Sequence, residues 1–154
     1  MGAGISRVRA IVNIIKEFGG SIEISRLAEE SRTNIDSLLP LIEASNQLGF
    51  TKIVESEIKL TQTGAKLNIK NSSALVKEGL QNLEPFKTTK KILEEQHDIS
   101  SKELFDELSR RGHVVHGDRV INDMMLKKVL IRWGVRSKMF RYSTDTDMWS
   151  LANS

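Results

Sequence analysis

Basic side chains are concentrated in one stretch of this chain of 154 residues. Residues 110–141 contain nine Lys and Arg against only Asp118 and Asp123, a net charge of +7, whereas residues 1–70 carry a net charge of +1. Cations at this density could neutralise nucleic-acid phosphates or meet another acidic partner. The candidate DNA-contacting residues are Arg110, Arg111, Arg119, Asn122, Lys127, Lys128, Arg132, Arg136, Lys138 and Arg141. The alternative is a solvated face, because exposed helices commonly carry Lys and Arg.

Residues that could support catalysis are sparse. The chain lacks the GxxxxGK[ST], GxGxxG, GxSxG and HExxH patterns, and with no cysteine it has no thiolate nucleophile or ligand. His113 and His116 lie three residues apart near Asp118, but two histidines without a third ligand make a weak metal site, and a solvated turn accounts for them. Turn chemistry likewise accounts for Asp145 and Asp147. We therefore expect no enzymatic activity, no metal and no cofactor.

The composition is typical of a globular protein, with 39% hydrophobic and 28% charged residues. A chain of this length can form one domain or two small ones and can bury a core. Its apolar runs stay below the roughly 18 residues that span a bilayer, and its N-terminus lacks the layout of a signal peptide. We therefore expect no membrane insertion and a cytoplasmic location, with which the absence of cysteine agrees.

The first half of the chain alternates helical and strand-like patterns. Apolar residues at three- and four-residue steps predict a helix over residues 5–18, which Gly19 and Gly20 end. The elements expected next are a strand at 22–24, a helix over 26–32 capped by Ser25, a helix that Asp36 or Ser37 caps and Gly49 ends, strands at 50–54 and 58–60, and a helical turn over 61–69. Within the helix that ends at Gly49, we expect Pro40 in the first turn. The side chains expected to pack inward from that helix are Leu38, Leu39, Leu41, Ile42, Ala44 and Leu48.

The second half repeats this order of elements. The elements expected are helices over 74–83 and from Pro85 onward, a strand at 97–99, a helix over 102–111, a turn at 113–117, a long helix from a cap at Asp118 to Gly134, and a hairpin of 139–142 with 147–151. Helix, strand, helix, turn, helix and hairpin is the order of a winged helix-turn-helix. The predicted fold is therefore α+β and mostly helical, with tandem winged helix-turn-helix units at residues 5–70 and 97–152 and connecting helices at 71–96.

The second helix of such a unit commonly reads the major groove of DNA. In the first unit this helix, residues 37–48, contains no Lys or Arg, which favours a buried or protein-contacting role. In the second unit, Arg119 and Asn122 would share a face near the helix start, and Arg110 and Arg111 could hold phosphate from the preceding helix. The aromatic residues nearby could stack on bases, but filling the core explains them better. These residues are Trp133, Phe140, Tyr142 and Trp149.

Several segments resemble one known family. They are Ser-Leu-Leu-Pro-Leu-Ile-Glu-Ala at 37–44, Leu-Gly-Phe at 48–50, Ile-Lys-Leu-Thr-Gln-Thr-Gly at 58–64, and the pattern of Phe140, Arg141, Tyr142, Asp145, Asp147, Trp149 and Leu151. This is the AAA-associated C-terminal domain, which is appended to ATP-binding subunits of ABC transporters of the nitrate/sulfonate/taurine type. The resemblance covers about residues 6–151 and implies a regulatory or coupling module. The chain has neither a phosphate loop nor a Leu-Ser-Gly-Gly-Gln signature, so it is either a stand-alone relative or a fragment, and ATPase activity does not carry over.

Two functions follow as hypotheses. The first is a non-enzymatic interaction module that docks onto a protein partner, either an ATPase subunit or a second copy, which would make a homodimer. The alternative is a transcriptional regulator that binds double-stranded DNA through the basic second unit. A small-ligand sensor has no pocket signature in this sequence.

Overall fold

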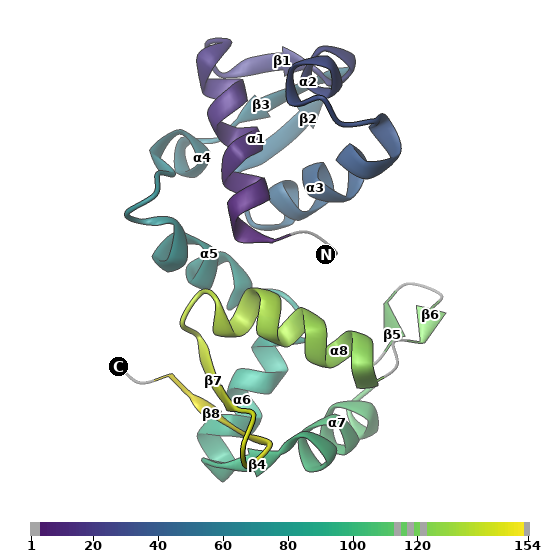
Figure 1. The fold of residues 1–154 in the computed structure, drawn as a ribbon, viewed down its shortest axis with the longest axis vertical. Helices are drawn as coiled ribbons and strands as arrows, with labels where there is room; N and C mark the ends of the chain where they lie inside the picture. Colours follow the sequence, from purple (N-terminus) through teal and green to yellow (C-terminus); the bar gives the residue numbers. More distant parts are fainter. Residues whose placement is uncertain (1–3, 113–114, 117–118, 121–122, 153–154) are drawn as a thin grey trace. The chain divides into compact units, whose positions relative to one another are not determined.

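The computed structural model describes residues 4–112, 115–116, 119–120 and 123–152 (Figure 1). It is an α+β protein with small antiparallel sheets and two compact units, of which unit 1 ends at Gly79 and unit 2 begins at Leu80. The segment expected to connect two domains is divided between them, since its first helix belongs to unit 1 and its second to unit 2. Across the described ranges, no helix has the length and hydropathy that crossing a membrane requires.

Unit 1 packs helices against a three-stranded sheet. Its elements are α1 (Ile5–Glu17), β1 (Ser21–Glu23), α2 (Ile24–Ser31), α3 (Ile35–Gln47), β2 (Thr51–Val54), β3 (Glu57–Leu60), α4 (Gln62–Lys66) and α5 (Ser72–Leu80, whose last residue lies across the unit boundary). The strand order is β1-β3-β2, so β3 is central and β2 is an edge strand. The buried face of α1 contacts β3, α2 and α3, and α1 crosses the sheet in Figure 1. Its buried residues are Val8, Ile11, Val12 and Ile15.

Unit 2 contains a second three-stranded sheet and a separate two-stranded hairpin. Its elements are α6 (Phe86–Gln96), β4 (Ile99–Ser100), α7 (Ser101–Arg110), β5 (Val115–His116), β6 (Arg119–Val120), α8 (Asp123–Val129), the π-helix η1 (Leu130–Val135), β7 (Phe140–Ser143) and β8 (Met148–Leu151). The strand order is β4-β8-β7, while β5 pairs with β6. The helix α6 contacts both α7 and β8.

The three-stranded sheets of the two units share one topology. In unit 1 the central Ile58 is paired with Ile22 on one side and Ile53 on the other. In unit 2 the central Trp149 is paired in the same way with Ile99 and Tyr142. The backbone agrees in detail, because the Ile24 amide donates to the Ser56 carbonyl and the Ser101 amide donates to the Asp147 carbonyl, each at 3.2 Å. The two sheets can therefore be compared residue by residue.

The helices that precede the two hairpins differ by one residue. After each helix comes a residue in the left-handed region, Gly49 (φ 85°) or Lys138 (φ 65°), followed by a buried residue whose amide donates to the carbonyl five residues back. Leu48 lies ten positions after the buried Leu38, and Ser137 lies eleven positions after the buried Leu126. The π-helix η1 accommodates the extra residue, as a one-residue insertion in an α-helix does. Leu126 is thus equivalent to Leu38, and Lys127 to Leu39.

Several predicted helix starts are wrong. Glu23, not Ser25, is the residue that precedes α2, and Asn34 caps α3 by accepting a hydrogen bond from the Ser37 amide at 2.8 Å. The helix α3 therefore starts earlier than predicted, and Pro40 is its sixth residue rather than part of its first turn. Proline there removes one intrahelical hydrogen bond, a loss that is smallest near a helix start.

The long helix of unit 2 begins later than predicted. Asp118, its predicted cap, lies outside the described residues, and the next two residues form β6, so the described helix begins at Asp123. The prediction that Arg119 lies on this helix is wrong, because it pairs with His116 in the β5–β6 hairpin. A local strand pairing thus occupies residues that the apolar periodicity assigned to the helix.

Candidate functional site

Unit 1 exposes an apolar strip on α3 and β2. Ile35 and Leu39 on α3 are each 46% exposed, and Ile53 on β2 is 45% exposed. Ile35 and Leu39 are four residues apart, so they lie on one face of the helix. The prediction that Leu39 packs inward is therefore wrong. We refer to Ile35, Leu39 and Ile53 as the apolar strip.

Hydrogen bonds hold α3 beside β2. The Thr51 hydroxyl, at the start of β2, donates to Asn46 Oδ1 at 2.5 Å and lies 3.0 Å from the hydroxyl of Ser45. Ser45 and Thr51 are buried, so these polar groups satisfy one another where water is excluded. Helical spacing places Asn46 on nearly the same side of α3 as Leu39, so this side of the helix is the one nearest β2.

Acidic residues border the apolar strip. No Lys or Arg occurs from Thr33 to Thr51. The exposed Asp36 and Glu43 lie on α3, on the side of the apolar residues away from β2, and the exposed Glu55 lies in the turn after β2. We refer to Asp36, Glu43 and Glu55 as the acidic rim. Large apolar side chains next to charges of one sign are a feature of protein-contacting surfaces.

The equivalent positions of unit 2 carry polar side chains that interact with one another. Lys127, at the position of Leu39, lies over the ring of Tyr142, at the position of Ile53, with 4.9 Å from Nζ to the ring centroid. Asp147 Oδ1 accepts hydrogen bonds from the hydroxyls of Tyr142 and Ser101, both at 2.6 Å, and lies 3.7 Å from Lys127 Nζ. Ser101 in turn accepts a hydrogen bond from Trp149 Nε1 at 2.8 Å. Unit 1 has only aliphatic side chains at the positions of Lys127 and Tyr142.

This network shifts the pKa of its charged members. The hydroxyl of Ser101, then that of Tyr142, holds the pKa of Asp147 below its ordinary value, and the nearby ammonium of Lys127 adds to the effect against partial desolvation. Tyr142 raises the pKa of Lys127, Asp147 adds to the rise, and desolvation opposes it. Both groups therefore keep their charge in the folded protein, as the Lys127–Asp147 pair requires.

Three predicted DNA-contacting cations are engaged within unit 2. Arg110 pairs with Glu107. Arg111 pairs with Glu107 at 2.9 Å and with Glu95 at 3.5 Å. Lys127 is held over Tyr142, as described above. Of the predicted pair near the helix start, Arg119 lies in β6 and Asn122 lies outside the described residues.

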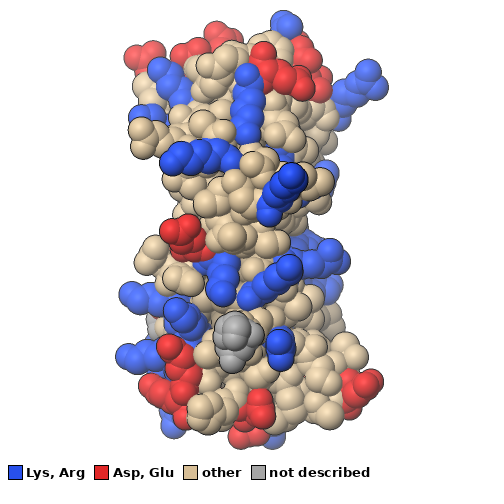
Figure 2. Space-filling model, turned by 90° about the vertical axis from the view of Figure 1, so that its left-hand side faces the viewer, with Lys and Arg blue, Asp and Glu red and all other residues tan. Residues whose placement is uncertain are grey.

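The other candidate cations remain on the surface of unit 2. Figure 2 shows Lys and Arg side chains grouped on the visible face of this unit, with acidic side chains toward one end. The exposed candidates are Lys128, Arg132, Arg136, Lys138 and Arg141. Lys128 and Arg132 are four residues apart on the α8–η1 helix, and Arg141 lies on the edge strand β7. Of the predicted set, these five cations are thus exposed on unit 2.

The aromatic residues of unit 2 mainly build its core. Trp133 and Trp149 are fully buried and Phe140 is 1% exposed, so they have no free ring faces for nucleic-acid bases. Tyr142 packs against Trp149, with ring centroids 4.5 Å apart. The prediction that these residues fill the core rather than stack on bases is confirmed for Trp133, Phe140 and Trp149.

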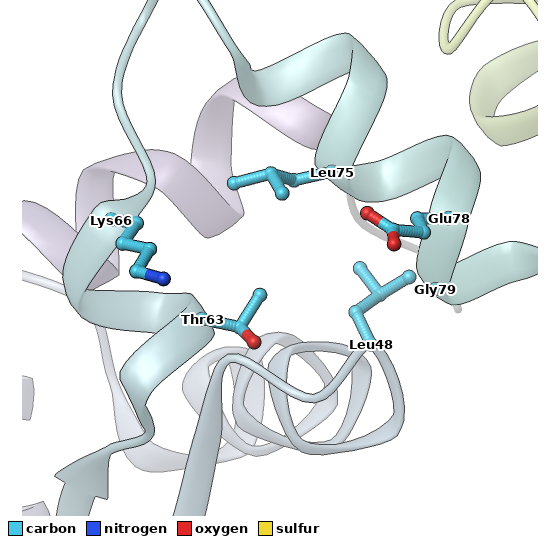
Figure 3. Close-up of a pocket in the computed structure, with 6 residues that line it drawn as sticks. All are labelled: Leu48, Thr63, Lys66, Leu75, Glu78 and Gly79. Atoms are coloured by element: carbon cyan, nitrogen blue, oxygen red, sulfur yellow. The ribbon is translucent and has the colours of Figure 1, made fainter.

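A hollow of about 360 Å³ lies in unit 1 between α4, α5 and the end of α3 (Figure 3). Lys66 and Glu78 lie on opposite sides of it, and Leu48, Thr63, Leu75 and Gly79 complete its lining. The end of α5 approaches α3 closely, because a Cβ on Gly79 would lie 2.9 Å from the Leu48 carbonyl oxygen. The charged lining groups are exposed to solvent, so the hollow offers a small ligand little desolvated surface.

Comparison with known proteins identifies the family of this chain. The chain belongs to the family described as the C-terminal AAA-associated domain, which it matches over residues 25–143. This match confirms the resemblance seen in the sequence. No curated protein matches the chain.

The apolar strip could not be predicted from periodicity. The leucine-rich run from Leu38 to Ile42 has apolar residues at nearly every angle around the helix, so its pattern does not separate Leu39 from its buried neighbours. A usable signal is the lack of any cation in the whole segment from Thr33 to Thr51, which extends beyond the predicted helix at residues 37–48.

Proposed function

We propose that the protein is a non-enzymatic docking module that binds an ATPase subunit through the apolar strip of unit 1. The observation that carries this proposal is the contrast between equivalent positions, which hold the interacting polar side chains Lys127 and Tyr142 in unit 2 and the exposed aliphatic side chains Leu39 and Ile53 in unit 1. Exposed aliphatic side chains at positions where the sister unit has interacting polar ones favour a partner-binding surface.

The family supports an ATPase as the partner. Its description ties the domain to AAA proteins, and the resemblance is to domains appended to the ATP-binding subunits of nitrate/sulfonate-type ABC transporters. Such subunits act at the cytoplasmic face of a membrane, so we propose a cytoplasmic location and a regulatory or coupling role.

Each unit is further proposed to be a winged helix-turn-helix. The second helices would be α3 in unit 1 and α8 with η1 in unit 2, and the wings would be the hairpins β2–β3 and β7–β8. The supporting observation is the shared strand order with the first hairpin strand at the edge. In unit 1 the second helix would then serve protein contact, since it lacks the cations that a groove-reading helix uses.

The test is binding of the chain to the ATP-binding subunit of a nitrate/sulfonate-type transporter, measured by biolayer interferometry. Leu39→Glu should abolish binding, because it places a charge within the apolar strip. The control is Gln62→Glu, which adds the same charge at an exposed position of α4, away from the strip and its acidic rim, and should leave binding unchanged. Absence of binding by the wild-type chain, or equal binding by Leu39→Glu, would refute the proposal.

Double-stranded DNA is a second candidate partner, favoured by the exposed cations of unit 2. Fluorescence anisotropy with a random-sequence duplex should then show binding that weakens steeply as salt rises. Lys128→Ala should weaken binding to all sequences about equally, whereas Lys127→Ala should affect it less, since Lys127 is held over Tyr142. No binding at low salt would exclude this candidate.

A further inference from the structure

The charges that border the apolar strip identify the kind of segment it binds. We infer that unit 1 takes an amphipathic helix of its partner, one with a row of Lys or Arg beside its apolar face. This inference rests on the proposed docking function and adds the chemistry of the partner to it.

The spacing of the strip and rim matches a helix. Ile35, Leu39 and Glu43 follow one another at four-residue steps along α3, and Asp36 and Glu43 are seven residues apart, about 10 Å along the helix axis. Residues seven apart on a partner helix have the same separation, so a helix laid along α3 can meet both carboxylates while its apolar face covers Leu39. A strand paired to the edge of β2 would cross only Ile53 and would leave the charges of α3 unmatched.

The sign of the rim disfavours other occupants. Asp36, Glu43 and Glu55 would repel an acidic helix and favour a basic one. Two copies of α3 packed antiparallel about Leu39 would bring Asp36 of one copy near Glu43 of the other, which repels as well. Lys52, the basic residue of β2, lies on the opposite face of the sheet from Ile53, because successive strand residues alternate in direction.

The experiment uses the full chain and two synthetic helical peptides of about 18 residues with identical leucine faces, one carrying a Lys row and the other a Glu row. Fluorescence anisotropy of the labelled peptides should show the Lys peptide binding at least about tenfold more tightly, with a preference that shrinks as salt rises. The Leu39→Glu variant should no longer bind the Lys peptide. The double variant Asp36→Lys with Glu43→Lys should bind the Glu peptide more tightly than the Lys peptide. Gln62→Glu on α4 is the matched control and should keep the wild-type preference.

The outcomes separate this inference from the docking proposal. Suppose that the chain binds the ATPase subunit in a way that depends on Leu39 but binds both peptides equally, or neither. This result would overturn the inference and leave the docking function standing. Failure of both assays would remove both. Light scattering on the eluting chain adds a third result, because self-association that Leu39→Glu abolishes would assign the strip to a second copy and overturn the inference.

Discussion

Gly49 and Lys138 occupy equivalent positions, and both have left-handed backbone conformations after the helix that precedes the hairpin of their unit. Glycine adopts this conformation without a steric cost, whereas another residue pays about 1–2 kcal/mol. Unit 2 thus carries a local strain at Lys138 that unit 1 avoids.

Replacing Lys138 by glycine should therefore stabilise the protein. We expect Lys138→Gly to raise the free energy of unfolding by up to about 1 kcal/mol, because relief of strain outweighs the extra freedom of glycine in the unfolded chain. Gly49→Ala is the reciprocal variant and should lower it by about 1 kcal/mol. Urea denaturation measures both, and a Lys138→Gly protein less stable than wild type would contradict the assignment.

Asp147 should make stability depend on pH in the acid range. Its pKa in the folded protein lies below the ordinary 3.8, so its ionised form stabilises the fold at higher pH, and this stabilisation is lost as pH falls through the folded-state pKa. Asp147→Asn should lower Tm at neutral pH and flatten the fall in Tm below about pH 4, while asparagine still tolerates the positive φ of 53°. Asp145→Asn in the same turn is the control, and equal pH profiles for the two variants would contradict this role.

The short helix α4 is fixed by a capping residue and a close backbone contact. Thr61 Oγ1 accepts a hydrogen bond from the Gly64 amide at 3.0 Å, and its hydroxyl donates to the Gly49 carbonyl at 2.5 Å. A Cβ on Gly64 would lie 1.9 Å from the Phe50 carbonyl oxygen, so only glycine fits. The Thr-Gln-Thr-Gly motif thus joins α4 to the turn between α3 and β2.

Adding a methyl group at this contact should be costly. Gly64→Ala should lower the free energy of unfolding by about 3 kcal/mol or more, because the obstacle is backbone and cannot rotate away. Thr63→Ala, at an exposed neighbouring position in α4, should change it by no more than about 0.5 kcal/mol. Denaturant titration of both variants measures these free energies of unfolding. A Gly64→Ala protein as stable as the Thr63→Ala control would show that α4 can shift away from Phe50 at little cost.

At the scale of the whole molecule, each unit has its own buried core. Both tryptophans of the chain, Trp133 and Trp149, lie in unit 2. Tryptophan fluorescence therefore reports the unfolding of unit 2, whereas far-ultraviolet circular dichroism reports both units.

This difference allows the independence of the units to be measured. Leu38→Ala removes a fully buried side chain from unit 1 and should destabilise that unit by about 2–5 kcal/mol. We expect the circular dichroism transition to split, with an early phase from unit 1 and an unchanged fluorescence midpoint. Leu126→Ala, at the equivalent position in unit 2, should shift the fluorescence instead. A common shift of both signals by Leu38→Ala would mean that the units unfold together.

Local signals in the sequence were enough to establish the order of the elements except for the β5–β6 hairpin. Apolar periodicity located α1, α3, α7 and both hairpins, and glycines at positions such as 49 and 112 marked helix ends, because these signals act over a few neighbouring residues. The motif around residues 37–50 also indicated the family. The family and the repeat of one order of elements in both halves thus follow from the amino-acid sequence alone.

Which side chains are available to a partner depends on the tertiary structure. Periodicity gives the side of the helix on which Leu39 lies. It does not show whether the sheet buries that side, because the strands of the sheet follow later in the chain. The same holds for Lys127, which a hairpin fifteen to twenty residues further on holds in place, and for Arg111, which pairs with Glu95 of another helix. Contacts between residues distant in sequence follow from packing. Charge counts alone therefore assigned Arg111 and Lys127 to a nucleic-acid surface, although the folded protein uses these cations in internal contacts.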